Sequence, residues 1–287
     1  MEMQSSITIR QMRKEDLTFA AECTKAEGWV SENRDMLDSF FLNDPEGCLV
    51  AEEDGRQVGI CIATNYISYG FIGELIVRPD VRGVGIGTAL LNKAVEFLKI
   101  KGVETIYLDG VLKATGLYER NGFRKICRSW RFSGQLRGKT NLSVRHMTKQ
   151  DIEQVIDLDK LYFGADRGFF LKRRFELFPE LCIVSTQNKR ITGYMMGRSA
   201  ETWVAAGPWV SEGEGSNPIE LLEALAVEAD GRSIGVGILD SNSAACMLMR
   251  SLGFMAREDS PWRMAMGKSV GLGATPQCMA VGSAAKG

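Results

Sequence analysis

A short glycine-rich stretch is the part of this chain whose residue types and spacing point most directly to chemistry. Residues 82–87 read Arg-Gly-Val-Gly-Ile-Gly and stand between a strand pattern and a helix pattern. Glycine lets the backbone approach a ligand closely. The first amides of a helix have no intrahelical partner and lie at the positive end of its dipole. The stretch therefore predicts an anion site, most naturally for a phosphate or pyrophosphate.

Two familiar phosphate motifs do not fit this stretch. A dinucleotide fingerprint, G-x-G-x-x-G, counted from Gly83 meets Thr88 at its last position, and a P-loop needs a lysine that is missing. A dinucleotide site also needs an acidic residue about 20 residues further on, where residues 101–103 read Lys-Gly-Val. The spacing therefore argues against a Rossmann-type oxidoreductase. Residues 232–237 repeat the R-x-x-G-x-G spelling, but a strand-like run overlaps them and no helix pattern follows.

The remaining pattern, R-x-x-G-x-G after a strand and before a helix, resembles the acetyl-coenzyme A loop of the GNAT superfamily of N-acetyltransferases. Residues 114–123 read Ala-Thr-Gly-Leu-Tyr-Glu-Arg-Asn-Gly-Phe and resemble the family's A-x-x-L-Y-x-x-x-G-F helix. The resemblance covers most of residues 5–133. One position departs from it: the Asn that often precedes the alanine by three residues is Val111 here.

The resemblance implies where acetyl-CoA would bind. In this family the central strand splays from its neighbour, and the pantetheine arm inserts between them as a false strand. Backbone groups of the central strand would bind that arm, and amides of the loop would hold the pyrophosphate. Arg82 would add charge, or would simply be an exposed loop arginine. The expected coenzyme-binding residues are Leu75, Ile76, Val77, Arg82, Gly83, Val84, Gly85, Ile86, Gly87 and Thr88.

Two side chains are candidates for catalysis. Tyr118, in the helix motif, is the expected general acid: a thiol's reference pKa of ~8.5 lies below tyrosine's ~10, so a hydrogen bond to the leaving sulfur suffices. The alternative is a tyrosine packed in the core. Glu74, in the central strand, is the candidate base for the attacking amine, with a solvent-facing or strand-paired glutamate as the alternative. Glu27 and Trp29 would lie on the acceptor side, although a tryptophan between helices is more often a core residue.

Positioning these residues requires a strand-rich domain, and the sequence indicates two of them. Residues 9–17 match residues 144–152, and Leu117-Tyr118 before Gly122-Phe123 matches Leu248-Met249 before Gly253-Phe254. We expect an α/β (α+β) fold of two tandem GNAT-like domains. Each would hold a mixed, mostly antiparallel twisted sheet flanked by helices, with a splayed central strand pair. The expected boundaries are 1–134 for the acetyltransferase domain, 135–140 for a linker and 141–287 for a degenerate GNAT-like domain with a tail.

The second half is expected to have lost the chemistry. Its loop position holds Glu212 and Glu214, which would repel a pyrophosphate, and its tyrosine position holds Met249. Coenzyme A is therefore expected in the first half only. Asp166 and Arg167 are expected as a charged pair near the domain interface, with a structural role favoured over acceptor binding. The Gly- and Ala-rich tail, residues 268–287, is expected to pack on the second domain.

Composition excludes several classes of partner. The chain has 287 residues, 45% apolar and 25% charged, with a formal net charge of −1, which favours neither nucleic acid nor an anionic membrane. Seven scattered cysteines without a C-x-x-C and a single histidine argue for reduced thiols, a cytoplasmic location and no metal site. No apolar run is long enough to span a bilayer. A monomer or a homodimer fits equally well.

The favoured function is direct transfer of an acetyl group from acetyl-CoA to a primary amine of a small molecule. The acceptor could be an amino acid, a polyamine or an aminoglycoside-like compound. The alternatives are a non-catalytic acyl-CoA-binding or regulatory module, and an acetyltransferase acting on a protein N-terminus or lysine. Tyr118 and the intact loop favour an enzyme.

Overall fold

The computed structural model describes residues 7–29, 32–200, 202–213, 217–268, 275–283, 285 and 287. Its elements follow the two-part plan expected from the sequence. The first half contributes, in chain order, β1 (Ile7–Gln11), α1 (Asp16–Ala26), α2 (Arg34–Asn43), β2 (Cys48–Glu53), β3 (Arg56–Asn65), β4 (Gly70–Val77), α3 (Ile86–Ile100), β5 (Thr105–Gly110), α4 (Thr115–Arg120) and β6 (Arg124–Gly134).

The second half repeats this order with a few additions at its end. It contributes β7 (Val144–His146), α5 (Ile152–Phe163), α6 (Gly168–Leu177), β8 (Cys182–Gln187), β9 (Arg190–Ser199), β10 (Trp203–Ser211), α7 (Pro218–Ala229), β11 (Ser233–Leu239), α8 (Ser243–Ser251), β12 (Met255–Ala256), β13 (Trp262–Gly267) and β14 (Cys278–Ala280). Short 3-10 turns precede β2, α3, α4 and β8.

One mixed sheet runs through both halves. The strands follow the order β1-β2-β3-β4-β5-β13-β6-β11-β10-β9-β8-β7, with β12 beside β6 and β14 beside β10. The pairs β4–β5 and β10–β11 are parallel, and the other pairs in the described residues are antiparallel. The expected α/β architecture, with mixed, mostly antiparallel strands flanked by helices in each half, is therefore confirmed, and the second half keeps the strand order of the first.

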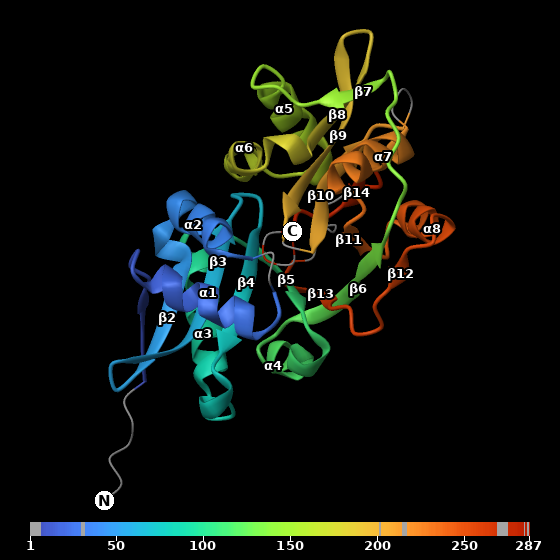
Figure 1. Ribbon diagram of the computed structural model, residues 1–287. Coiled ribbons are helices and arrows are strands. Elements are labelled where there is room, and N and C mark those ends of the chain that lie inside the picture. Colours follow the sequence, from blue (N-terminus) through green and yellow to red (C-terminus); the bar gives the residue numbers. More distant parts are fainter. Residues whose placement is uncertain are drawn as a thin grey trace, which may run out of the picture.

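The two halves exchange strands at their junction. β13, from the second half, lies between β5 and β6 of the first half and pairs antiparallel with both. β6 in turn pairs with β11 and β12 of the second half. Figure 1 shows β6 and β13 side by side where the two parts of the molecule meet. The expected boundary at residues 135–140 stays a prediction. The sheet of each half includes pairing with a strand from the other half.

Helices cover both faces of each half. In the first half, alternate strand residues divide between two cores: Ile60 and Phe71 pack toward α1 and α2, while Cys61 and Ile72 pack toward α3. This division follows from the two-residue period of a strand. In the second half, α7 covers one face and α5 and α6 cover the other. The candidate site therefore lies on a sheet that is buried on both faces.

A repeated ion pair shows the duplication in atomic detail. Arg10 Nη1 lies 2.6 Å from Asp16 Oδ2, and Arg145 Nη1 lies 2.7 Å from Asp151 Oδ2. Asp16 also accepts a hydrogen bond from the backbone of Arg13, and Asp151 accepts one from the equivalent backbone amide. Both carboxylates thus tie the first strand of a half to the start of its first helix.

Candidate active site

The centre of the candidate site is a β-bulge on β4. The register between β3 and β4 shifts between Ile60 and Ile62, so that Ile60 lies opposite Ile76 and Ile62 opposite Gly73. Glu74 carries the bulge with φ of 49°. A non-glycine residue in this left-handed region is strained, and such strain tends to persist at functional sites. Glu74 is 4% exposed, so this carboxylate faces the interior rather than solvent.

Beyond the bulge, β4 and β5 separate. Their parallel pairing covers Gly70 to Ile72 on β4 and stops at the pair Ile72–Leu108. After that point β4 remains paired to β3, for example Ile76 with Ile60, while β5 is paired on its other edge to β13. We call the region between β4 and β5 beyond Ile72 the first-half split. Leu75, Ile76 and Val77, the expected pantetheine contacts, line its β4 edge, where no strand of the described residues pairs with the backbone.

The glycine loop forms the start of α3, as its sequence predicts. Gly83 and Gly85 have φ of 89° and 97°, and Gly85 is the residue that caps the helix. The first helical hydrogen bond runs from Ala89 N to Gly85 O at 3.0 Å. The amides of Ile86, Gly87 and Thr88 therefore have no partner within the helix, and Val84 beside them is exposed. This set of amides can hold an anion.

Arg82 and Glu27 meet beside this loop. Arg82 Nε donates to Val77 O at 2.8 Å, and its Nη2 donates to Glu27. The other oxygen of Glu27 accepts from Lys113 Nζ at 2.9 Å. Burial alone would raise the pKa of Glu27, but the hydrogen bonds from Lys113 and Arg82 hold that pKa below its usual value. The structure thus places Glu27 beside the glycine loop. Trp29 is half-buried against the α1–α2 core.

Tyr118 lies on α4 with its ring against β5. A Cβ built on Gly110 would lie 2.9 Å from the Tyr118 ring, so the glycine makes room for this close contact. The side chain is 7% exposed, and burial raises the pKa of the phenol well above its usual value of 10. No hydrogen bond links its hydroxyl to another described residue. The phenol is therefore held protonated, with its donor available.

Cys61 connects the two catalytic candidates. It lies on β3 opposite the bulge, fully buried in the same core as Tyr118. Burial raises the pKa of this thiol, and the charge of Glu74 adds to that effect. The charge of Cys61 would in turn raise the pKa of Tyr118. Cys61 thus lies opposite the bulge that carries Glu74 and in the same core cluster as Tyr118.

The corresponding split in the second half is filled by the chain itself. The pairing of β10 with β11 ends at Ala206–Val236, and we call the region beyond it the second-half split. There β14 pairs antiparallel with β10, and Val281 N donates to Gly237 O of β11 at 2.9 Å. Met249, at the position equivalent to Tyr118, is fully buried. The tail therefore occupies the place that is left without a strand neighbour in the first half.

The loop of the second half also lacks the features of its counterpart. Glu212 pairs with Arg190, with 2.9 Å between Oε1 and Nη1. Glu214, the other expected acidic residue, lies outside the described residues. The cap of α7 is Asn217, whose side chain accepts from Ile219 N at 3.1 Å and so uses a helix-terminal amide.

Two expectations about the second half need correction. Arg167 does not pair with Asp166: it is buried and binds Asp159, with 2.8 Å between Nη2 and Oδ1, while Asp166 binds Lys160 at the surface. The tail also reaches further than expected. β14 packs on the second half, but a Cβ built on Gly73 of β4 would lie 2.5 Å from Ala285 Cα. The tail therefore contacts the first half at the start of its split.

Sequence reasoning missed the buried charges between the halves. Asp109, at the end of β5, accepts from Arg263 Nε at 2.5 Å and from Arg131 Nη2 at 2.7 Å. Burial alone would raise the pKa of Asp109, but the two arginines outweigh it and lower that pKa. The one signal available was an arginine inside the apolar run of residues 262–266, Trp-Arg-Met-Ala-Met.

Two other kinds of feature are absent from the part of the chain that the structure describes. No group of three or more His, Cys, Asp or Glu side chains is placed to hold a metal ion among these residues. Within the same residues, no helix is both long and apolar enough to cross a membrane. The described cysteines are all free.

Models of known protein families match both halves of the chain. A family model described as "Acetyltransferase (GNAT) family" matches residues 9–123, and one described as "Acetyltransferase (GNAT) domain" matches residues 155–273. An uncharacterised N-acetyltransferase of Methanocaldococcus jannaschii is 36% identical over 147 residues. That match covers 43% of this chain and 64% of the relative, which is slightly less than two thirds of its length.

Solved structures show a similar fold over both halves. The crystal structure of a candidate acetyltransferase from Pyrococcus horikoshii has a TM-score of 0.81 at 22% identity, covering 98% of this chain and 96% of that one. A tandem GNAT protein from the clavulanic acid biosynthesis pathway has a TM-score of 0.65 at 14% identity, covering 93% of this chain and 100% of that one. At these identities the likeness shows the fold alone.

Proposed function

The chain belongs to the GNAT acetyltransferase family, with one family domain in each half, and on that premise we propose that it is an N-acetyltransferase with one active site. Its first half would transfer an acetyl group from acetyl-CoA to a primary amine of a small molecule. Transfer would be direct, with both substrates bound together. The observation that carries the proposal is the buried, strained Glu74 at the point where β4 leaves β5.

The first-half split suits the coenzyme in two places. A strand edge without a neighbour offers a row of backbone donors and acceptors, which an extended chain can pair with. Leu75, Ile76 and Val77 supply that edge for the amide-containing pantetheine arm. At the far end, the amides of residues 84–88 and the dipole of α3 would hold the pyrophosphate. Arg82 would add a positive charge beside it.

Three groups would then carry the transfer. Acetyl-CoA supplies the acetyl thioester, whose C–S bond breaks as the C–N bond to the amine forms. Glu74 would accept, directly or through a water, the proton that the amine loses. Tyr118 holds its own proton at Oη, since burial keeps its pKa high, and would donate a hydrogen bond to the departing sulfur.

The second half would carry out no acetyl transfer. Its split is filled by β14, its loop carries Glu212, and Met249 has no proton to donate. We propose that this half instead completes the first through β13 and covers the acceptor side.

A coenzyme A thiol-release assay over a panel of primary amines tests the proposal. Calorimetry on the same protein should show acetyl-CoA binding. Release of thiol that depends on an added amine supports the enzyme. Tight binding without amine-dependent release across the panel would favour the alternative, a non-catalytic acyl-CoA-binding module. Amines should include peptides with a free N-terminus or lysine, so that a protein acceptor is detected if it is preferred.

A further inference from the structure

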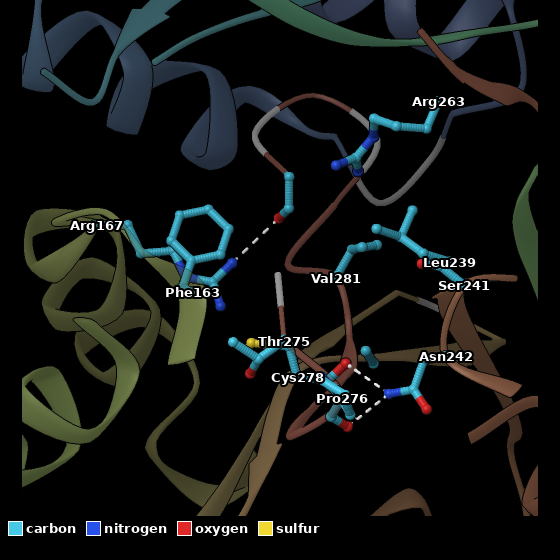
Figure 2. A pocket seen from close by; sticks show the side chains of 12 residues that line it. Phe163, Arg167, Leu239, Ser241, Asn242, Arg263, Thr275, Pro276, Cys278 and Val281 are labelled. Carbon is cyan, nitrogen blue, oxygen red and sulfur yellow. Dashed lines mark hydrogen bonds between the residues drawn. The ribbon is translucent and has the colours of Figure 1, made fainter. Parts of the chain in front are cut away.

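A cavity lined by residues of the second half lies next to the tail, close to the junction with the first half. Its volume is about 240 Å³, and its polar lining includes Arg167, Arg263, Ser241, Asn242 and Thr275. Figure 2 shows the guanidinium groups of Arg167 and Arg263 turned inward from opposite sides. Typical ligand pockets measure ~300–1,000 Å³. The size therefore suits a small ligand or one end of a larger one.

Arg263 lines this cavity and has a side-chain hydrogen-bond donor without a partner among the described residues. It lies on β13 and is 3% exposed. Its Nε donates to Asp109 Oδ1 at 2.5 Å, but its Nη2 is buried and has no hydrogen-bond partner among the described residues. Arginine presents its donors in a rigid planar fork that matches a carboxylate. An unsatisfied guanidinium nitrogen at a buried cavity is costly, which points to a missing acceptor.

One buried donor around the cavity is left without an acceptor. Asp109 is shared, because it also accepts from Arg131 Nη2 at 2.7 Å. Arg167 is matched by Asp159, and its Nη1 donates to Gly287 O at 3.2 Å. Among the described residues, the Nη2 of Arg263 is therefore the buried guanidinium nitrogen of the lining that lacks a partner. A carboxylate is the acceptor that the planar guanidinium matches best.

The cavity adjoins the first-half split. Asp109 directly follows Leu108, the last β5 residue paired with β4. The Arg263 guanidinium lies 5.0 Å from the centre of the Phe71 ring on β4. Gly287, which lines the cavity, lies against the same ring: a Cβ built on it would be 3.5 Å away. A small molecule whose anionic end meets Arg263 would therefore have its other end close to where β4 and β5 part.

We propose that Arg263 binds a carboxylate of the acceptor, so that the amine substrate belongs to the amino-acid class rather than to polyamines or aminoglycosides. This inference rests on the proposed acetyl transfer. It assigns the acceptor's charge to a buried arginine that the second half contributes through β13. The exchange of strands would then serve the reaction, because the first half alone lacks Arg263.

The test compares acids with matched compounds that lack the carboxylate. Wild-type protein is supplied with acetyl-CoA and each of the standard amino acids, its carboxamide and its decarboxylated amine. We expect at least one amino acid to be acetylated with a kcat/KM at least about 100-fold above that of both its carboxamide and its decarboxylated amine, since a site built to bond a polar group strongly rejects analogues without it. Equal or faster acetylation of the carboxamide and the decarboxylated amine would overturn the proposal while leaving the acetyltransferase function intact.

A binding measurement gives the proposal a readout that does not need turnover. The same compounds are titrated into the protein saturated with coenzyme A, and the heat of binding is recorded. Selective binding of an acid over its carboxamide supports the carboxylate site even if no transfer is detected. If no acid binds better than its carboxamide, the site is not for a carboxylate, whatever the transfer assay shows. Failure of coenzyme A itself to bind would count against the proposed function instead.

Three variants, one of them a control, test whether the preference for the acid arises at the cavity. Arg263→Lys keeps a positive charge beside Asp109 but removes the planar fork, and should narrow the preference for the acid over its carboxamide by at least tenfold. Arg131→Lys is the matched control: it is a buried arginine on the same carboxylate that does not line the cavity, so the preference should persist. Thr275→Val, a milder change in the lining, should narrow the preference less. An unchanged preference in folded Arg263→Lys would overturn the proposal.

Discussion

The two halves of this chain have the same strand order but differ in strand pairing at the split. In the first half, β4 leaves β5 after Ile72, and a strained, buried glutamate marks the point of separation. In the second half, β10 leaves β11 after Ala206, and β14 pairs with β10 beyond it. An exposed strand edge has to be paired or covered. Among the described residues, the second half therefore pairs its β10 edge with its own chain, while β4 of the first half has no strand on that edge beyond Ile72.

The two halves also differ in what each contributes to the other's sheet. β13 lies between β5 and β6, and the tail reaches Gly73 of β4 (Figure 1). Duplication thus supplied a second sheet whose last strands now complete the first. The following changes are chosen to break or sharpen this contrast.

The largest effect is expected from removing the phenol that the first half has and the second lacks. Tyr118→Phe should lower turnover by ~10²–10⁴-fold, the usual contribution of a general acid, and leave acetyl-CoA affinity nearly unchanged. Steady-state kinetics and calorimetry measure the two. Tyr107→Phe is the control, because Tyr107 is equally buried and lies on the neighbouring strand β5. Wild-type turnover in Tyr118→Phe would remove the residue from the mechanism.

The pH profile gives a second view of the same residue. Burial raises the pKa of Tyr118 above its ordinary value of 10. The phenol is protonated below that raised pKa, so its donor is present at neutral pH and is lost only at strongly alkaline pH. Turnover should therefore show no decline due to Tyr118 between about pH 7 and 10. An alkaline limb in that window that disappears in Tyr118→Phe would contradict the assignment.

A carboxylate placed in the loop should give the next largest effect. Gly85→Asp should weaken coenzyme A binding roughly 100-fold, about 2.7 kcal/mol, because its charge would repel the pyrophosphate. Gly85→Asn carries the same shape without charge and should bind more tightly than Gly85→Asp. Gly213→Asp is the matched control, since Gly213 has φ of 90° against 97° for Gly85, and both face open space. Calorimetry that finds equal affinity in all three variants would place the pyrophosphate elsewhere.

A smaller effect, on stability alone, is expected where β14 fills the second-half split. Met279 is 8% exposed in the core of that half. Met279→Ala should lower the free energy of unfolding by about 2 kcal/mol, the low end for such truncations, without changing coenzyme affinity. Met255→Ala, at a methionine that is 74% exposed, should change stability little. Equal denaturant midpoints for the two variants would show that β14 does not support the second half.

The smallest effect is expected at Arg82. Its side chain is partly exposed and already bonded to Val77 and Glu27, and exposed charge pairs are worth ~0.2–1 kcal/mol. Arg82→Ala should therefore weaken coenzyme A binding by no more than about fivefold, and less at high salt. Arg56→Ala, another exposed arginine of the first half paired to Asp80, is the control. A loss as large as that of Gly85→Asp would make Arg82 a principal phosphate ligand.

Much of the first half could be predicted from sequence because its signals are local. The strand before Pro79, the glycine loop and the amphipathic α3 are adjacent in the chain, and each has its own periodicity. The duplication was also visible, since the Arg10–Asp16 and Arg145–Asp151 pairs lie within the matched segments. Membership of the family and the two-sheet fold followed from these patterns.

The strand exchange and the buried charges could not be predicted in the same way. β13 and β14 are short, and their partners lie far away in the chain: Arg263 and Asp109 are 154 residues apart. Whether Arg167 pairs with Asp159 or Asp166 depends on the turn between α5 and α6, which no local pattern determines. These contacts depend on how the halves pack together. No local sequence pattern could therefore predict the cavity that Arg263 lines.

The central claim, one working split and one filled split, is tested most directly by counting coenzyme molecules. Coenzyme A is titrated into the intact chain by calorimetry. A fragment of residues 1–133 is not a substitute for the intact chain, because it would lack β13. The account predicts a stoichiometry of one per chain, with binding strongly weakened in Gly85→Asp and retained in Gly213→Asp. A stoichiometry of two, or binding that survives in Gly85→Asp and is lost in Gly213→Asp, would contradict it.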